Sequence, residues 1–513
     1  MDEPFDIIVV GAGSSGAVIA ARAAEDPRRS VLLVEAGPDY PDLSRLPFDL
    51  VNSHNNSYTA HDWGLTYQPT VAGRSQPFPR GRVTGGSSAV NTTIALRGVP
   101  EDYDGWAAAG SPEWAWEKVL PAFRRLERDL DFGDRPYHGD AGPITIRRYR
   151  WDELTKVHQA WLETADELGY PRCDDANAPD SWGAGPHPMN KIGRLRISTA
   201  IGYLAPARAR PNFRILPLAL TRRVFFEGRR AVGVEVERDG AVETLRGRLI
   251  VLSAGAIHSP AILLRSGIGP AAELARLGIE PVRVAPGVGT RLSDHPALAV
   301  VATVRNPAIL DPDQPIVQTI LRYTAPASPY RNDLQVEAFS FSPRGGGPLL
   351  AIAVAAVLEQ VNGTGTLRLP SADPHAAPII ENRFCEDAED RRRLIACFRD
   401  ALRFVTTGPL GALVDRIVFP DVTRDLSDEV IGQLLLRFAA SGYHPCATAP
   451  MGPADDAGAV VDQYGRVHGT EGLVVADASI MPTVPRANTN LTSIMIGEMV
   501  GEWLRTRPDR YGL

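Results

Sequence analysis

A glycine-rich turn near the N-terminus is the feature that most constrains how this chain can fold. The segment Phe5–Val10 is apolar and rich in β-branched residues, and Gly11, Gly13 and Gly16 follow it in the spacing G-x-G-x-x-G. A helix is predicted to open at Ala17. In such a turn the first glycine permits the tight bend, the second lets a phosphate approach the backbone, and the third lets helix and strand pack closely. The pattern predicts a βαβ dinucleotide site with the pyrophosphate at the helix N-terminus.

The next strand strengthens this prediction. Val31–Val34 is a second apolar segment, and it ends in Glu35, which lies 19 residues after Gly16. A carboxylate is expected there to bind a ribose, and it favours a free 2′-hydroxyl over a 2′-phosphate. The alternative is a glycine-rich turn without a ligand, and the complete set of strand, helix, strand and acid argues against it. The motif by itself does not separate FAD from NAD.

Size and charge exclude several classes of function. The chain has 513 residues, which favours two domains over one. Its net charge of −7 gives no electrostatic reason to expect a nucleic-acid partner. The three lysines, Lys118, Lys156 and Lys191, lie outside the glycine-rich motifs, which argues against Schiff-base chemistry. The four cysteines form no C-x-x-C pair, so we expect neither a disulfide framework nor a metal site.

Location is predicted from two segments. The first strand begins at about residue 5, which leaves no room for a signal peptide. The longest strongly apolar run, Leu349–Leu358, is too short to span a bilayer and is typical of a buried strand. We therefore expect a cytoplasmic protein without a membrane span.

A second glycine-rich stretch points to a family. Pro79–Gly98 contains Gly85-Gly86-Ser87-Ser88, whose small residues and backbone N–H groups can lie against a flat ring or a phosphate. This stretch resembles the first signature of the glucose–methanol–choline (GMC) oxidoreductases, a family of FAD enzymes, and Asp102–Trp106 also fits. Ala254–Pro270 resembles the second signature, and Pro286–Pro296 resembles another loop of the family. The resemblance extends from residue 5 to about residue 505.

The strand pattern and the resemblance together predict an α/β fold with two domains. One is a Rossmann-like FAD-binding domain, built on the βαβ unit and discontinuous: residues 1–155, 200–300 and 435–513. The other is an α+β substrate-binding domain, an antiparallel sheet with helices on one face: residues 156–199 and 301–434. Strands are expected at 212–218, 223–227, 231–237, 248–253, 333–341, 366–369 and 473–477, with helices at 156–168, from 259 and around 386–406. Residues 36–78 look irregular, as in a lid or a cofactor cover.

Two polar residues near the C-terminus carry the predicted chemistry. His444 and Asn488 are 44 residues apart, and by resemblance they are the active-site histidine and its partner. Oxidation of an alcohol removes a hydride from carbon and a proton from the hydroxyl. Histidine suits the proton transfer because its ordinary pKa is about 6.5. An asparagine N–H can hold the alcohol oxygen, while the redox step belongs to the cofactor.

The motifs and the resemblance also define a cofactor site. The predicted cofactor-binding residues are Gly11, Gly13, Ser14, Ser15, Gly16, Glu35, Ala36, Arg82, Gly85, Gly86, Ser88, Asn91, Thr92, Thr93, Val224, Ala254, Asp477, Ala478, Asn488 and Thr489. The backbone of Val224 would meet the adenine. Some members bind flavin covalently through a histidine beside the Gly-Gly-Ser-Ser loop, but this chain has Ala89-Val90-Asn91, so we expect noncovalent FAD. Trp63 and Tyr443 are candidates for the substrate pocket, with plain packing as the alternative.

The resemblance implies FAD-dependent oxidation of an alcohol to an aldehyde or ketone, by hydride transfer to flavin N5. Dioxygen or another acceptor would take the electrons. The His/Asn pair looks closest to aryl-alcohol and furfuryl-alcohol oxidases and to choline-type enzymes. The alternative is an FAD-retaining lyase that cleaves cyanohydrins; a light-driven decarboxylase and a non-catalytic FAD protein are further possibilities. His258 and His295 are expected to be structural. The substrate, the natural acceptor, the pathway and the oligomeric state do not follow from the sequence.

Overall fold

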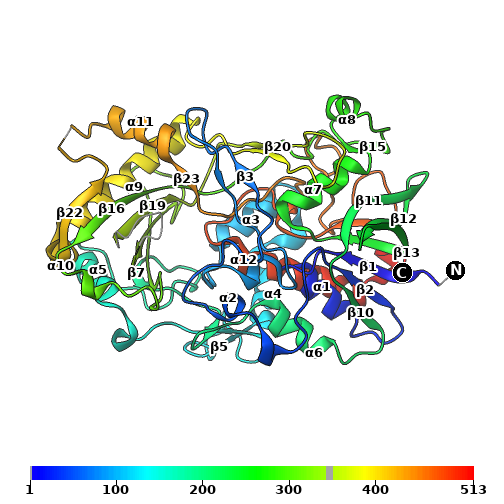
Figure 1. The fold of residues 1–513 in the computed structure, drawn as a ribbon, viewed down its shortest axis with the longest axis horizontal. Helices are drawn as coiled ribbons and strands as arrows, with labels where there is room; N and C mark the ends of the chain where they lie inside the picture. Colours follow the sequence, from blue (N-terminus) through cyan, green and yellow to red (C-terminus); the bar gives the residue numbers. More distant parts are fainter. Residues whose placement is uncertain (1–2, 342–350, 424) are drawn as a thin grey trace.

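The first of two large sheets is built around the strand that precedes the glycine turn. A computed structural model describes residues 3–341, 351–423 and 425–513. The sheet has the order β10 (Phe213–Leu216), β2 (Val31–Val34), β1 (Phe5–Val10), β13 (Ala241–Leu252), β12 (Arg230–Arg238) and β11 (Leu220–Glu227), and β24 (Leu473–Val475) also pairs with β13. β1 and β2 have the predicted bounds, and β10, β2, β1, β13 and β24 pair in parallel. Helix α1 (Gly16–Ala23) packs on β1 and β2, and α12 (Thr489–Thr506) packs on α1 (Figure 1).

One long strand joins the parallel part of this sheet to a hairpin. Residues 241–246 of β13 pair antiparallel with β12, and residues 247–252 pair in parallel with β1. β11 pairs antiparallel with β12. β11, β12 and the first half of β13 thus form hairpins that extend the nucleotide-binding sheet.

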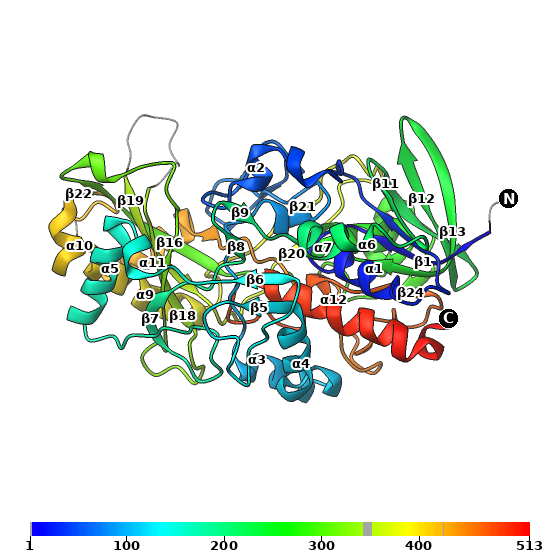
Figure 2. The same ribbon diagram turned by 90° about the horizontal axis from the view of Figure 1, so that it is seen from below.

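The second sheet is antiparallel and carries its helices on one face, as predicted. Its order is β22 (Val414–Phe419), β16 (Pro296–Val304), β19 (Ile352–Leu358), β18 (Leu334–Phe339), β17 (Thr319–Tyr323) and β7 (Gly183–Pro186), and β23 (Ala440–Ser441) pairs with β16. Helix α9 (Ala388–Thr406) packs on β16, β18 and β19, and α5 (Lys156–Glu167) packs on β7 and β18. Figures 1 and 2 show α5, α9, α10 (Gly408–Leu413) and α11 (Asp428–Phe438) together at the end of the molecule far from the chain termini.

Shorter elements connect the two sheets. The remaining helices are α2 (Phe48–Val51), α3 (Pro100–Ala108), α4 (Trp116–Leu126), α6 (Ala205–Ala207), α7 (Gly255–Arg265) and α8 (Ala271–Leu277). Five two-stranded ribbons complete the strands: β3–β4 (Thr66–Tyr67, Gln76–Pro77), β5–β6 (Glu127–Asp129, Ile144–Ile146), β8–β9 (Lys191–Ile192, Leu195–Arg196), β14–β15 (Ile268–Gly269, Arg283–Val284) and β20–β21 (Thr366–Arg368, Ile379–Glu381). Residues 36–78 contain only short pieces of regular structure, as expected.

Helix α7 corrects one prediction. The sequence places its start at Ser259-Pro260, but α7 begins at Gly255, so Pro260 lies inside the helix. Proline has no N–H to donate to the carbonyl four residues earlier, which is that of Ala256. The Thr448 hydroxyl donates to that carbonyl instead, at 2.6 Å. A side chain from a distant segment thus satisfies the acceptor that proline leaves open.

The predicted domain ranges stay a prediction. β16 crosses the expected division between residues 300 and 301, and β23 lies within the range given to the FAD-binding domain although it pairs with β16. Of the apolar run at 349–358, Ile352–Leu358 forms β19, and Leu349 and Leu350 lie outside the described residues. Within the described part of the chain, no helix is both long enough and apolar enough to cross a bilayer.

Candidate active site

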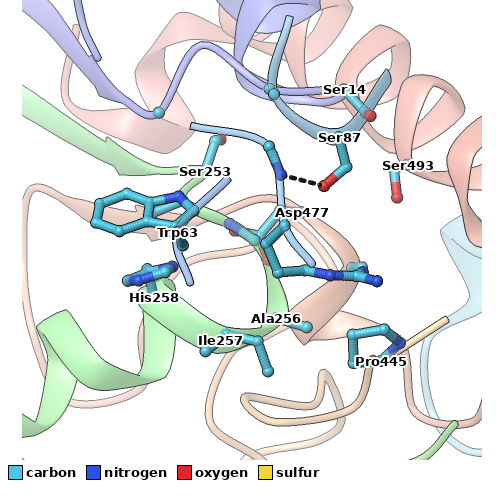
Figure 3. Close-up of a pocket in the computed structure, with 18 of the residues that line it drawn as sticks. Ser14, Trp63, Ser87, Ser253, Ala256, Ile257, His258, Pro445, Asp477 and Ser493 are labelled. Carbon is cyan, nitrogen blue, oxygen red and sulfur yellow. Dashed lines mark hydrogen bonds between the residues drawn. The ribbon is translucent and has the colours of Figure 1, made fainter. Parts of the chain in front are cut away.

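A deep cavity opens at the carboxyl ends of the parallel strands of the first sheet. Its wall includes Val10 at the end of β1, Glu35 after β2, Ser253 after β13 and Asp477 after β24. Ligands of open α/β sheets bind at this edge, where the loops that follow the strands converge. Figure 3 shows Ser253, Asp477 and Ser14 around this cavity, although they come from three different segments of the chain.

Three helices begin at the same cavity. Ser14 and Ser15 lie before or at the start of α1, Gly255 begins α7, and Asn488 precedes α12. The first N–H groups of a helix have no partner within the helix, and the helix dipole places partial positive charge there. This part of the cavity is therefore suited to a phosphorylated ligand.

The glycines of the first motif have different roles. A Cβ on Gly16 would lie 1.9 Å from the Gly11 carbonyl oxygen, and Gly11 itself has a φ of +95°. A Cβ on Gly86 would lie 2.6 Å from the Cα of Gly13, so the second glycine turn packs directly on the first. A Cβ on Gly13 would meet nothing nearer than 3.8 Å. Gly13 is thus the motif glycine that faces open space, and the cavity fits a dinucleotide pyrophosphate there.

Two backbone N–H groups hold Glu35 at the wall of the cavity. Its Oε2 accepts from the backbone N–H of Ala12 at 2.9 Å, and its Oε1 accepts from that of Gly37 at 2.8 Å. Burial raises the pKa of Glu35 to about 7, while the backbone N–H groups lower it. Each carboxylate oxygen has further capacity to accept from a ribose hydroxyl, which would favour the ionised form.

Asp477 anchors the loops around the cavity. Its Oδ2 accepts from the Gly255 N–H at 2.8 Å and from the Ser259 hydroxyl at 2.5 Å. Its Oδ1 accepts from the N–H and the hydroxyl of Ser479, at 2.8 and 2.6 Å. This carboxylate fastens the start of α7 to the end of β24, so its own hydrogen-bonding capacity is largely used within the protein.

His444 and Asn488 come together at the far wall of the cavity. The Asn488 Nδ2 lies 2.9 Å from the His444 Nε2, and both residues line the cavity. Because an amide nitrogen only donates, Nε2 of His444 is the acceptor in this contact. The proton of a neutral His444 is then on Nδ1, which lies 2.9 Å from Nδ1 of His295. His295 was expected to be structural, and the structure places it in contact with His444.

Asp294 fixes the loop that presents His444. Its Oδ1 accepts from the backbone N–H groups of His295 and His444, each at 2.8 Å. Its Oδ2 accepts from the Ser441 hydroxyl at 2.5 Å. Burial raises the pKa of Asp294 to about 6, and these hydrogen bonds oppose that shift.

The electrostatic environment keeps both histidines neutral near neutral pH. Burial lowers the pKa of His444 well below its ordinary value, and His295 and the Arg80 guanidinium lower it further. Burial also lowers the pKa of His295 to about 3. A neutral imidazole can accept a proton on its unprotonated nitrogen, which is Nε2 here, so His444 is suited to act as a base.

Aromatic side chains from the irregular segment 36–78 close part of the cavity. The Trp63 ring lies over that of His258 (Figure 3), and their centroids are 4.0 Å apart. The Arg82 guanidinium lies 4.8 Å from the Trp63 centroid. Tyr58 and Tyr443 have ring centroids 6.2 Å apart. His258 therefore lines the cavity, and burial lowers its pKa to about 3.

Most predicted site residues meet at this one cavity. Lining it are Gly11, Gly13, Ser14, Ser15, Glu35, Ala36, Gly86, Asn91, Thr92, Ala254, Asp477, Ala478, Asn488 and Thr489 of the cofactor set, together with His444, Trp63 and Tyr443. Gly16, Arg82, Gly85, Ser88, Thr93 and Val224 are not part of the lining. The Ser88 hydroxyl turns inward and donates to the Gly85 carbonyl at 2.6 Å. On β11 the lining residues are Leu220 and Thr221 rather than Val224.

Several lining residues were not among the residues predicted for the site. They include Tyr58, Arg80, Ser87, Ser253, Arg265, Pro374 and Asn490. Ser253 and Asn490 directly follow or flank motif residues, so proximity to the motifs was a usable signal. Pro374 gave none, because the chain brings it to the cavity from a distant loop.

Comparisons with known proteins agree with this geometry. Two family models, both described as GMC oxidoreductase, match residues 5–297 and 362–497. The chain is 37% identical to 5-(hydroxymethyl)furfural oxidase of Methylovorus sp. (strain MP688), over 99% of both chains. It is 33% identical to the oxygen-dependent choline dehydrogenase of Brucella anthropi, over 98% of this chain and 96% of the relative. The crystal structure of pyridoxine 4-oxidase from Mesorbium loti matches with a TM-score of 0.90 and 28% identity, over 98% and 99% of the two chains.

The fold and the site define an FAD-dependent oxidoreductase that acts on CH–OH groups. The chain belongs to the GMC oxidoreductase family, as its motifs predicted. Its cofactor is FAD, and the open face of Gly13, the three helix starts and the Glu35 carboxylate fit that group.

Proposed function

We propose that this enzyme oxidises a primary alcohol to an aldehyde, with His444 as the base and Asn488 as the hydrogen-bond partner of the alcohol oxygen. The contact of 2.9 Å between His444 Nε2 and Asn488 Nδ2 carries the proposal. It brings one proton acceptor and one N–H donor to the same point of the cavity wall. When bound, FAD supplies the hydride acceptor, and dioxygen or another acceptor takes the electrons on.

Each residue then has a defined task. The hydroxyl proton passes to Nε2 of His444, whose lone pair faces Asn488. The Asn488 N–H turns to the alcohol oxygen and holds it while negative charge develops. His295, next to Nδ1 of His444, and Asp294, on its backbone N–H, fix the orientation of the imidazole. We also propose that FAD is bound noncovalently, because Val90 and Asn91 stand beside the glycine turn and neither can form a histidyl bond to the flavin.

The relatives suggest which alcohols to test first. One relative is named for a hydroxymethylfuran and another for choline, and both are hydroxymethyl-bearing compounds. Tyr58, Trp63 and Tyr443 in the cavity wall can stack on a ring-bearing alcohol, and aromatic faces also attract a quaternary ammonium, so both classes are tested. Cytoplasmic location stays a prediction.

An anaerobic titration tests the proposal. Purified enzyme is mixed with benzylic, furfuryl, sugar and choline-type alcohols while the flavin absorbance is followed. One class should bleach the flavin, and readmitted air should restore the colour if dioxygen is the acceptor. A flavin that stays oxidised while a cyanohydrin is cleaved would overturn oxidation in favour of a lyase.

The variant His444→Ala tests whether His444 is the base. It should keep its FAD and reduce it about 10²–10⁴-fold more slowly, the usual contribution of a general base. His375→Ala is the matched control, because His375 is exposed and pairs with Glu237 on the surface. Normal reduction by His444→Ala would remove His444 from the mechanism.

A further inference from the structure

One arginine in the wall of the active-site cavity has no acidic partner. Arg80 lies shortly after β4 and lines the cavity together with Tyr443 and His444. Its Nε donates to the Pro79 carbonyl at 2.5 Å, and one of its terminal nitrogens donates to the Tyr443 carbonyl at 3.0 Å. Both acceptors are neutral, and no carboxylate of the described residues forms an ion pair with this side chain. The charge of Arg80 is therefore left without a direct counter-charge.

The acid that acts most strongly on Arg80 is already engaged elsewhere. Burial lowers the pKa of Arg80, and the Asp294 carboxylate is the strongest of the groups that raise it. One oxygen of Asp294 accepts from two backbone N–H groups, and the other accepts from the Ser441 hydroxyl and the Asn382 amide. Asp294 thus acts on Arg80 through its charge without a hydrogen bond. An anionic ligand that reached Arg80 would favour the charged form of its guanidinium.

Part of the Arg80 guanidinium is open to the cavity. An arginine side chain has five N–H donors, and the two contacts to carbonyls use two of them. The second terminal nitrogen donates to no acceptor among the described residues, and it is not enclosed by protein. The side chain is only half-buried although it forms part of the cavity wall. A ligand in the cavity can therefore reach the remaining donors.

Aromatic rings flank this guanidinium. Its central carbon lies 4.8 Å from the ring centroid of Phe78 and 5.9 Å from that of Tyr443. The ring of Tyr58, another lining residue, has its centroid 6.2 Å from that of Tyr443. Contacts between a cation and aromatic faces hold the guanidinium in place without neutralising it. A ligand ring that packs on Tyr443 would therefore lie beside a positive charge.

The acids of the cavity wall do not compete for Arg80. Among the described lining residues they are Glu35 and Asp477, and each accepts hydrogen bonds from the protein through both of its oxygens. His444 is neutral, and Asn488 presents an N–H donor. An anionic group at this end of the cavity would therefore meet the free N–H groups of Arg80 and no acid that occupies them.

We propose that Arg80 is a subsite for a carboxylate, carried by the alcohol substrate on the part of the molecule away from the reacting carbon. A hydrogen bond between a guanidinium and a carboxylate is strong because both partners are charged. Arg80 donates to Tyr443, the residue directly before His444, so the carboxylate would bind beside the base that takes the hydroxyl proton. This inference rests on the proposed alcohol oxidation and names its substrate class, with Arg80 as the specificity-determining residue.

Two pairs of matched alcohols test the subsite. They are 3- and 4-(hydroxymethyl)benzoate, each compared with the corresponding amide, which has nearly the same shape and no charge. The measurement is the anaerobic rate of flavin reduction against concentration, near pH 8.5, where His444 is unprotonated whatever its charged neighbours. At least one acid should reduce the flavin about tenfold or more efficiently than its amide. The net charge of −7 disfavours an anion, so such a preference has to arise locally.

The variant Arg80→Met tests whether this residue causes the preference. Methionine keeps an unbranched side chain and removes the charge, so the ratio between acid and amide should fall to about twofold or less. Arg80→Lys keeps a charge and should retain part of the ratio. Arg74→Met is the matched control, because Arg74 is an exposed arginine in the turn between β3 and β4, and it should keep the full ratio. An unchanged ratio in Arg80→Met would overturn the subsite.

A binding measurement separates this inference from the proposed function, because it does not depend on turnover. In calorimetric titrations of the FAD-loaded enzyme, 3- or 4-methylbenzoate should bind about tenfold more tightly than its amide, and Arg80→Met should remove the difference. Equal or reversed affinities would overturn the subsite even if no alcohol is oxidised. Equally efficient reduction by the acids and the amides would also overturn it and would leave alcohol oxidation intact.

Discussion

At the scale of single residues, the site depends on a histidine that its surroundings keep unprotonated. His444 is held between Asn488 on one ring nitrogen and His295 on the other. Its lowered pKa arises mainly from burial and secondarily from His295 and Arg80. The Arg80 guanidinium also donates to the Tyr443 carbonyl at 3.0 Å, so it is tied to the loop that carries His444.

The pH dependence of flavin reduction should show the lowered pKa of His444. A base must be unprotonated, and a lowered pKa keeps it so at lower pH, so the rate should stay constant above about pH 6.5 and fall only below it. In Arg80→Met the loss of positive charge should raise that pKa and move the fall to higher pH. The measurement is the anaerobic reduction rate from pH 4.5 to 9. A fall centred above pH 6.5 in the unaltered enzyme would contradict the assigned environment.

Substitutions at two motif glycines should separate the effect on FAD binding from the effect on stability. Gly13→Val should give a folded protein that retains little FAD, because the new side chain enters the open space that the pyrophosphate would occupy. Gly16→Ala should instead lower stability, because its Cβ would lie 1.9 Å from the Gly11 carbonyl oxygen. The ratio of flavin to protein absorbance and the unfolding temperature measure the two effects. A yellow Gly13→Val protein would show that the phosphate lies elsewhere.

At the scale of elements, helix α12 supports the end of the cavity that holds Asn488. Asn488 directly precedes this helix. The helix packs against α1, and α1 begins at the glycine turn. Two glycines allow this close approach: a Cβ on Gly497 would lie 2.8 Å from the Ser15 carbonyl oxygen, and one on Gly501 would lie 2.7 Å from the Arg22 Cβ. The distance between the two helices is therefore set by these glycines.

A single methyl group should test that packing. Gly497→Ala should destabilise the protein by about 1–3 kcal/mol, the usual cost of overpacking, and should also lower FAD retention because α12 moves away from α1. Gly105→Ala in α3 is the matched control, since no atom lies within 4 Å of its added Cβ. It should be neutral or stabilising by about 0.5–1 kcal/mol. Urea unfolding midpoints compare the two; equal midpoints would show that α12 is free to shift.

At the scale of the whole molecule, the buried Arg486 joins helix α3 to the second sheet near the active site. Arg486 donates through its Nε to Asp102 of α3 at 2.7 Å, and its backbone carbonyl accepts from Arg322 of β17 at 2.8 Å. It also donates to the Arg331 carbonyl at 2.7 Å. Since Arg486 precedes Asn488 by two residues, this network fixes the catalytic loop relative to the second sheet.

Loss of the Arg486 side chain should lower the stability of the protein. Arg486→Met leaves the Asp102 carboxylate, which is 2% exposed, without its ion-pair partner, and should destabilise the protein by about 3–5 kcal/mol. The double variant Asp102→Asn/Arg486→Met removes the unpaired charge and should recover part of that loss. Urea unfolding measures both. If the double variant is no more stable than Arg486→Met, the buried charge is not the cause.

Local pattern was sufficient to predict much of the fold. The bounds of β1 and β2 followed from apolar segments next to turn residues, and the alternating strands predicted the antiparallel second sheet. Helix α7 was predicted to start late because Thr448, which offsets the missing N–H of Pro260, is 188 residues away from it. The inward direction of the Ser88 hydroxyl was also beyond the pattern, because the glycine turn decides it.

The sequence by itself determined the family and the FAD cofactor, and it selected the residues proposed for the cofactor site and the catalytic pair. Those residues lie in contiguous motifs, where short-range backbone geometry decides what each residue can contact. Only the tertiary structure decided the contact of His295 with His444 and that of Arg80 with the Tyr443 carbonyl. The partners are 149 and 363 residues apart in the chain, and such contacts depend on how the whole chain packs, which local patterns do not encode.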